Sequence, residues 1–166
     1  MKKPIIYLAG PLGFSEVGRL FHEQVVLPMV GEIGYDVRDP WALTSEEEIE
    51  AVSKMPRAEE RRERWFELNR VMGERNAEAI RESDVIMAVL DGVDVDSGTA
   101  SEVGFGFALG KKIIGYRGDF RLSSDNEGSV VNLQVEHFIL QSGGWIVFDV
   151  NKLRLSLQRV YTSLVA

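Results

Sequence analysis

Cysteine is absent from this chain of 166 residues, and histidine occurs only twice. Without thiols, the chain has no disulfide framework, no thiolate zinc site and no cysteine nucleophile. Basic residues are outnumbered, since 19 Lys and Arg stand against 26 Asp and Glu, and the formal net charge is −7. A chain with this balance offers no basic field to attract phosphates, which argues against a nucleic-acid-binding protein.

Long apolar runs are missing as well. No stretch of the sequence approaches the roughly 20 apolar residues that a membrane span requires. Residues 1–10 have the length of one strand and do not resemble a signal peptide. We therefore expect a cytoplasmic protein with no membrane partner. Hydrophobic residues make up 45% of the chain, as in ordinary globular proteins, and we expect one domain over residues 1–166.

The most informative stretch of the sequence covers residues 84–111. Its apolar run, residues 85–90, predicts a strand that is buried on both faces. Three acidic residues occupy the loop that follows, namely Asp91, Asp94 and Asp96. From Thr99 the apolar spacing becomes helical, and Gly110 supplies a stop signal. In an open parallel sheet, ligands bind at the edge where strands pass into such loops.

Strands and helices alternate along the whole chain. The predicted strands cover residues 4–9, 34–37, 85–90, 113–116 and 145–148. This alternation predicts a parallel sheet with helices on both faces and right-handed crossovers. We therefore predict an α/β fold: a flavodoxin-like three-layer sandwich with a five-stranded parallel sheet in the order 2-1-3-4-5. The switch point of that order lies between strands 1 and 3 and brings residues 7–11 beside residues 91–98.

The helices are predicted from apolar spacing and from capping residues. Ser15 caps a first helix that reaches about Glu32 and that Pro28 is expected to kink or end. A long helix over residues 57–82 is expected to bury Leu68, Val71, Met72 and Ile80. A later helix is expected over residues 130–141. The final helix is expected to turn Leu153, Leu157, Val160 and Leu164 inward.

Glu102 is the residue that the pattern singles out. It is expected in the first turn of the helix after the acidic loop, with Gly104 and Gly106 behind it so that a ligand can approach closely. The helix N-terminus should keep a carboxylate there ionised. An ionised carboxylate can attack the anomeric carbon of a sugar. The simpler interpretation is a favourable interaction with the helix dipole.

Two other chemistries of acidic loops fit the sequence poorly. A twelve-residue calcium loop from Asp91 to Glu102 would place Val93 and Val95 at ligand positions and Asp96 where glycine is required. A phospho-acceptor receiver domain, which shares this fold, needs an acidic pair after strand 1 and a lysine after strand 5. The chain offers neither. We predict no metal site and no cofactor.

Three pieces of the sequence, in order, resemble the nucleoside 2-deoxyribosyltransferase family. They are Y-L-A-G-P at residues 7–11, D-S-G-T-A-S-E-V-G-F-G-F-A-L-G-K at residues 96–111 and V-N-L-Q at residues 131–134. The D-x-G-x-x-x-E-x-G block is the most specific of them. The resemblance implies a cofactor-free glycosyltransferase of nucleotide salvage that moves 2-deoxyribose between nucleobases with retention at C1′. Its substrates would be a deoxynucleoside and a free nucleobase.

The resemblance also implies roles for individual residues. Glu102 corresponds to the nucleophile that forms a covalent 2-deoxyribosyl-enzyme, and Tyr7 to the tyrosine that orients it. Asp96 corresponds to the aspartate that accepts from the 5′-hydroxyl. Asn132 corresponds to an asparagine that reaches the same hydroxyl from a neighbouring subunit. The resemblance therefore implies a homo-oligomer, built from dimers, whose active sites are shared between subunits.

Other positions are expected at the substrate, and one departs from the family. Gly10 and Gly98 are expected to line the site. Asn76 stands where the family often has an aspartate that protonates the leaving base. Asparagine can hydrogen-bond a base but cannot supply a proton, so the proton must come from another carboxylate or from solvent. Asp91 and Asp94 either contribute to base binding or are solvated loop residues.

Two rival functions use the same fold. One is a 2′-deoxynucleoside 5′-monophosphate N-glycosidase, in which water replaces the second base. Its phosphate pocket favours small hydroxyl residues, whereas Asp96 and Asn132 stand at those positions here, and a carboxylate repels a phosphate dianion. Ser97 and Thr99 keep this rival open. The other rival is a nucleotide-sensing module, which would not need Glu102 as a nucleophile.

Aromatic and histidine residues receive structural interpretations. Trp41, in the loop after strand 2, is the best candidate for a platform that stacks on a base. Phe14 either borders the base pocket or packs against the protein. His22 and His137 fall on predicted helices and are interpreted as surface or core residues.

Overall fold

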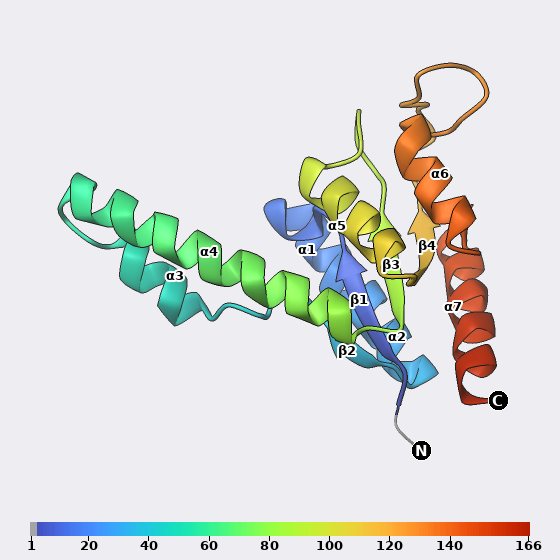
Figure 1. Cartoon of the computed structure of the whole chain (residues 1–166), viewed down its shortest axis with the longest axis horizontal. Helices are drawn as coiled ribbons and strands as arrows, with labels where there is room; N and C mark the ends of the chain where they lie inside the picture. Colours follow the sequence, from blue (N-terminus) through green and yellow to red (C-terminus); the bar gives the residue numbers. More distant parts are fainter. Residues whose placement is uncertain (1–2) are drawn as a thin grey trace.

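The computed structural model describes residues 3–166, and a five-stranded parallel sheet lies at its centre (Figure 1). The strands are β1 (Ile5–Ala9), β2 (Asp36–Arg38), β3 (Val85–Val89), β4 (Lys112–Tyr116) and β5 (Trp145–Val147). They are ordered β2-β1-β3-β4-β5, and each neighbouring pair is parallel. The α/β fold and the strand order predicted from the sequence are therefore confirmed.

Helices cover both faces of this sheet. The elements are η1 (Leu12–Phe14), α1 (Glu16–Phe21), η2 (His22–Val26), α2 (Leu27–Ile33), α3 (Glu46–Ser53), α4 (Ala58–Glu82), α5 (Ser97–Ala108), α6 (Leu133–Gln141) and α7 (Val150–Val165). Of these, η1 is a 3₁₀ turn and η2 is π-helical. Among the described helices, none is long and apolar enough to cross a membrane.

Two apolar cores lie on the opposite faces of the sheet, because successive side chains of a strand point in opposite directions. Ile6 and Leu8 of β1 belong to the core that η2, α2 and α7 cover. Tyr7 and Ala9 belong to the other core, which α4, α5 and α6 cover. The alternation within β1 therefore turns the Tyr7 side chain toward the α5 side of the sheet.

The first helical region does not end at Pro28, which was one of the two expected outcomes, and the other, a kink, stays a prediction. The α1, η2 and α2 segments follow one another without a gap from Glu16 to Ile33. The N–H of Leu27 donates to the carbonyl of His22, five residues back, which is the hydrogen bond of a π turn. Pro28 lies at the start of α2. A proline there is tolerated because its missing N–H falls where the hydrogen-bond register changes.

The long helix α4 lies on the sheet only at its C-terminal end. Its buried residues are Ala79 and Ile80, and Figure 1 shows the rest of α4 extending beyond the sheet beside α3. The prediction of a core stripe is therefore right for Ile80 but wrong for Leu68, Val71 and Met72, of which Val71 is exposed. Apolar spacing cannot distinguish a full core from a single neighbouring helix.

Polar contacts hold α3 against α4. Ser45 and Glu48 form a reciprocal capping box at the start of α3. Glu48 also receives two hydrogen bonds from Arg75 of α4, at 2.9 and 3.0 Å. Arg75 also donates to the carbonyl of Leu43 and to the hydroxyl of Thr44, and so holds the end of the connection from β2 to α3.

Two helix ends differ from the prediction. The α6 helix begins at Leu133 and not at residue 130, because Asn132 accepts hydrogen bonds from the N–H groups that follow it and acts as the N-cap. In α7, which Asp149 caps, Leu153 is buried but Leu164 is exposed. Leu164 lies in the last turn of α7, beyond the edge of the core.

Arg117, directly after β4, is buried although it carries a guanidinium group. It is 1% exposed and donates to the backbone carbonyls of Leu90, Gly92 and Arg121. The first two carbonyls belong to the segment after β3, and the third belongs to the loop after β4. Arg117 therefore ties together two loops at the carboxyl edge of the sheet.

We predict that Arg117→Met lowers the free energy of unfolding by about 2–4 kcal/mol, because the carbonyls lose their donor in a buried place. Urea denaturation measures this change. Arg62→Met, at an exposed position of α4, is the matched control and should change stability by less than about 0.5 kcal/mol. Equal stability of the two variants would contradict a structural role for Arg117.

Candidate active site

A tyrosine and a glutamate meet at the carboxyl edge of the sheet. The hydroxyl of Tyr7, on β1, donates a hydrogen bond of 2.6 Å to Oε1 of Glu102, on α5. Tyr7 is fully buried and Glu102 is half-buried. Two residues that lie 95 positions apart in the chain are thus joined by the crossing of α5 over β1 and β3.

Asp96 starts the helix that carries Glu102. Its Oδ2 accepts from the backbone N–H of Thr99 at 2.9 Å and from the Thr99 hydroxyl at 3.1 Å, so Asp96 is the N-cap of α5. Because the helix already begins at Ser97, Glu102 lies in its second turn and not in the first. The expectation of a first-turn position was therefore wrong.

The pKa of Glu102 also differs from the expectation of an ionised carboxylate held by the helix N-terminus. Burial raises the pKa of Glu102 to about 7, against a lowering by the Tyr7 hydrogen bond and a smaller rise from the charge of Asp96. The helix N-terminus has little influence in the second turn. Burial therefore outweighs the stabilisation on which the prediction of a fully ionised carboxylate rested.

Tyr7 keeps its proton beside this carboxylate. Burial raises the pKa of Tyr7 far above that of an ordinary phenol, and the charge of Glu102, its hydrogen bond and the charge of Asp39 add to the rise. Tyr7 is therefore a permanent hydrogen-bond donor to Glu102. Because Oε1 is engaged by this bond, Oε2 is the oxygen of Glu102 that remains for a substrate.

A cavity of about 250 Å³ opens in front of Glu102. It is lined by Gly10, Phe14, Pro40, Trp41, Met72, Asn76, Asp96, Gly98, Thr99 and Glu102. Five of the site residues named from the sequence thus line one cavity, namely Gly10, Asn76, Asp96, Gly98 and Glu102. Tyr7 is hydrogen-bonded to Glu102 and does not line the cavity itself. A second hollow of about 280 Å³ shares Asn76, Gly98 and Glu102 and lies between α4 and α5. Glu102 is therefore approached from two sides.

Asn132 does not lie in this cavity. Its Oδ1 accepts from the N–H groups of Gln134 and Val135, at 3.0 and 3.4 Å. It borders a separate, mainly polar hollow together with Asp94 and residues 122–125. Within one copy of the chain, Asn132 and Glu102 therefore border different cavities, and the contact expected from a neighbouring subunit stays a prediction.

The other two acids of the loop hold the loop itself. Oδ1 of Asp91 accepts from the backbone N–H of Asp119 at 2.9 Å, and Oδ1 of Asp94 accepts from the N–H of Val95 at 2.8 Å. Neither side chain lines the cavity of Glu102. Among the described residues, no cluster of three or more acidic or histidine side chains is arranged to hold a metal ion.

Sequence reasoning missed Pro40 and Met72 as cavity residues. Met72 precedes Asn76 by one helical turn, so the spacing on α4 was an available signal. Pro40 follows β2 at the sheet edge where ligands bind. Trp41 and Phe14, which were considered as walls of a base pocket, do line the cavity. Their rings meet edge to face, with 4.8 Å between the ring centroids.

The arrangement suits chemistry at an electron-poor carbon. A half-buried carboxylate with one free oxygen faces a cavity that a second carboxylate, Asp96, also lines. Negative charge held in place stabilises a transition state in which positive charge develops on a sugar ring. An aromatic wall and the Asn76 amide offer stacking and hydrogen bonds to a planar heterocycle.

Comparison with known proteins gives the family and the fold. The family model described as "Nucleoside 2-deoxyribosyltransferase" matches residues 6–134. No protein of curated function matches the sequence. Among solved structures, a conserved protein from Enterococcus faecalis V583 superposes with a TM-score of 0.70 at 20% identity, over 95% of this chain and 99% of that one.

Two further structures come from enzymes. A 2-deoxyribosyltransferase from Bacillus psychrosaccharolyticus gives a TM-score of 0.58 at 21% identity, with 90% of each chain covered. A CMP N-glycosidase from Clostridium botulinum gives 0.55 at 18% identity, over 92% of this chain and 99% of that one. At these low identities, the superpositions show a shared fold and no more. The family match itself spans most of the chain, from β1 through Asp96 and Glu102 to Asn132, and the chain therefore belongs to the nucleoside 2-deoxyribosyltransferase family.

Proposed function

We propose that the protein transfers 2-deoxyribose between nucleobases and that Glu102 is its nucleophile. The observation that carries this proposal is the bond between Tyr7 and Oε1 of Glu102 at the wall of a nucleoside-sized cavity. We further propose that it works in cytoplasmic nucleotide salvage, without a cofactor.

The proposed reaction has two displacements. Oε2 of Glu102 attacks C1′ of the deoxynucleoside, a C1′–O bond forms, and the C1′–N bond breaks with its electron pair going to the leaving base. A nitrogen of the incoming base then attacks C1′, loses its proton and releases the carboxylate. Two inversions give retention at C1′. The substrate lacks a 2′-oxygen, which eases formation of the oxocarbenium-like transition state.

We propose that groups other than Glu102 bind the base and supply the proton that the leaving base takes up. Asn76 lines the cavity, and its amide can donate to and accept from a base edge without ionising. A protonated Glu102 cannot serve as nucleophile, so the leaving base takes its proton from solvent or from another carboxyl group. The opening between α4 and α5 gives solvent a path to this region.

Asp96 is proposed to hold the sugar. Its Oδ2 caps α5, so Oδ1 is the oxygen available to accept from the 5′-hydroxyl. Gly98 and Gly10 border the same cavity. Sugar and nucleophile are thus aligned by one helix, because Asp96 caps α5 and Glu102 lies in its second turn.

A second copy of the chain is proposed to complete the site with Asn132. This residue lies outside the cavity of its own chain, at the start of α6. The adjacent Leu133 is 51% exposed, and Leu140 on the same helix is 50% exposed. Burial of these side chains in a dimer would carry Asn132 toward the cavity of the partner.

One observation keeps a nucleotide N-glycosidase as the rival: the Clostridium botulinum CMP N-glycosidase, which acts on a ribonucleoside monophosphate, shares this fold. The cavity argues for free nucleosides. The Thr99 hydroxyl, which could have served a phosphate, already donates to Asp96. The Asp96 carboxylate at the same position repels a phosphate dianion.

Replacing the nucleophile tests the central claim. Glu102→Ala should lower the rate of base exchange by at least about a thousandfold, as loss of a nucleophile does in other enzymes. The variant should still bind deoxynucleoside in calorimetry. Glu74→Ala, an exposed glutamate on α4, should exchange bases at the parental rate. Parental exchange in Glu102→Ala would exclude Glu102 as the nucleophile and favour the sensor.

The pH profile tests the ionisation of Glu102. The pKa of Glu102 is raised to about 7, and the proposed active form is the carboxylate. Because protonation removes this form, kcat/KM should fall about tenfold per pH unit as the pH drops below 7. Because the Tyr7 hydrogen bond lowers the pKa of Glu102, Tyr7→Phe should move this limb to higher pH. A limb that stays in place in Tyr7→Phe would show that the bond does not tune the nucleophile.

Substrate competition separates transferase from hydrolase. With a deoxynucleoside and a second free base, the transferase should form the new deoxynucleoside as the main product. With a deoxynucleoside 5′-monophosphate alone, it should release base at least about tenfold more slowly, because the Asp96 carboxylate repels the phosphate. Chromatography of both mixtures measures this. Rapid release of sugar phosphate without exchange would instead establish the rival hydrolase.

A further inference from the structure

A histidine outside the cavity contacts the loop that forms the cavity wall. His22 is 7% exposed and begins the π-helical segment η2. Its Nε2 lies 2.8 Å from Oδ2 of Asp39, directly after β2. Since a carboxylate only accepts, the Nε2–H of His22 donates to Asp39. Both side chains are about nine-tenths buried, so this bond is shielded from water.

Asp39 uses its other polar atoms to shape the turn that follows. Its Oδ1 accepts from the backbone N–H of Trp41 at 3.1 Å, and its carbonyl accepts from the N–H of Ala42 at 3.0 Å. Pro40 between them has a restricted φ. His22 therefore anchors, through one carboxylate, a turn whose Pro40 and Trp41 both line the cavity of Glu102.

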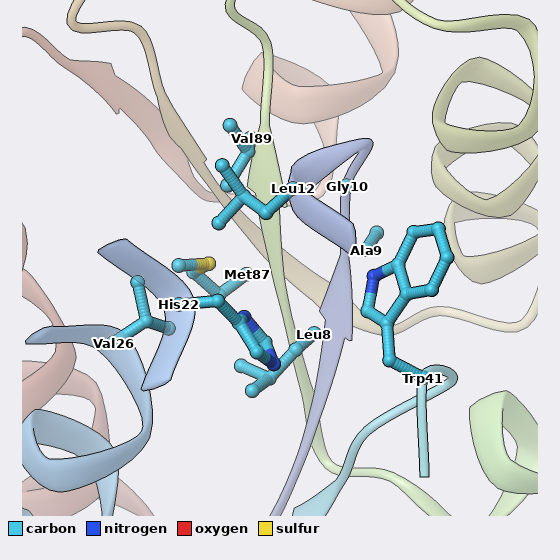
Figure 2. A pocket seen from close by; sticks show the side chains of 9 residues that line it. All are labelled: Leu8, Ala9, Gly10, Leu12, His22, Val26, Trp41, Met87 and Val89. Carbon is cyan, nitrogen blue, oxygen red and sulfur yellow. The ribbon is translucent and has the colours of Figure 1, made fainter. Parts of the chain in front are cut away.

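Trp41 closes this wall by direct packing. A Cβ atom added to Gly13 would meet the indole ring at 2.2 Å, so the ring lies against the backbone at that position. Phe14 meets the same ring edge to face. Figure 2 shows His22 and Trp41 approaching the end of β1 from its two sides.

The space between His22 and Trp41 excludes a ligand-binding role for the histidine. The hollow that both border has a volume of only about 10 Å³, which holds at most about one water molecule. Its other walls are apolar side chains and Gly10. His22 can therefore act only on its neighbours. A π-helical turn is rare and often accompanies function.

We propose that His22 is a positioning residue of the active site. Its hydrogen bond to Asp39 holds the turn of Pro40 and Trp41 against Gly13 and Phe14, and thereby sets how tightly the cavity binds the nucleobase. The inference rests on the proposed function in assigning a base to this wall. It predicts an effect on substrate affinity and not on the chemical step, because the bond between Tyr7 and Glu102 and the charge of Asp39, which acts on Tyr7, both remain when His22 is replaced.

The test combines kinetics with a probe of Trp41 that needs no turnover. His22→Met fills the same space without a donor, and His22→Gln restores an amide donor near the position of Nε2. His22→Met should raise KM for the deoxynucleoside about tenfold, as loss of a hydrogen bond to a charged group does, and should change kcat less than about threefold. His22→Gln should recover most of the parental KM. Gln24→Met, at an exposed position of the same π-helical segment, should match the parent.

The environment of Trp41 is followed by ¹⁹F NMR of protein labelled with 5-fluorotryptophan. The chain has three tryptophans, so three resonances are expected, and Trp41→Phe assigns one of them. In the absence of substrate, His22→Met should shift the Trp41 resonance toward that of an exposed indole and leave Trp65 and Trp145 unchanged. His22→Gln should return it. If His22→Met does not fold, His22→Asn, whose amide is too short to reach Asp39, replaces it.

The outcomes separate the two proposals. An unchanged Trp41 resonance in the donor-free variant would overturn the positioning role, as would His22→Gln behaving like His22→Met, since packing alone would then explain the effect. A fall in kcat with KM unchanged would also overturn it. If the parent exchanges no bases, the proposed function fails, and the ¹⁹F spectra still decide whether His22 positions Trp41.

Discussion

The site depends on the balance between burying a carboxylate and hydrogen-bonding it. Burial of Glu102 disfavours its charged form and raises its pKa to about 7, while the hydroxyl of Tyr7 opposes that rise. A fully solvated glutamate would be ionised but would stabilise a developing positive charge only weakly, because water screens it. A fully buried one without a donor would stay neutral. The bond from Tyr7 keeps Glu102 between these limits, where an oxocarbenium-like transition state can be stabilised.

The parallel sheet provides the precision that this bond requires. Tyr7 of β1 pairs with Ile86 of β3. From β3 the chain continues through the acidic loop into α5. Arg117 ties the segment after β3 to the loop after β4 through backbone carbonyls. Asp96 then caps the first turn of α5 and also lines the cavity. The proposed nucleophile and the proposed sugar anchor are thus placed by a strand, a buried cation and a helix cap.

The remaining cavity walls come from parts of the chain that are less tied to the sheet. Met72 and Asn76 lie on α4, most of which extends beyond the sheet beside α3. Trp41 lies on the connection between β2 and α3, where Asp39 and His22 hold the turn. The side of the cavity that we propose faces the base can therefore vary in shape while Tyr7, Asp96 and Glu102 keep their geometry. This division suits a reaction in which one base leaves and a different base enters.

The sequence alone determined the α/β class, the strand order 2-1-3-4-5 and the meeting of strand 1 with the acidic loop. These follow from local periodicity and from general rules of parallel sheets, and such information is carried by neighbouring residues. Only the tertiary structure decided which apolar residues are core, since Leu68 and Val71 show the spacing of a core stripe but have only α3 to pack against. It also decided the charge state of Glu102 and the contact between His22 and Asp39. Burial and hydrogen bonding between distant residues set both, and no local pattern records which side chains the fold brings out of water together.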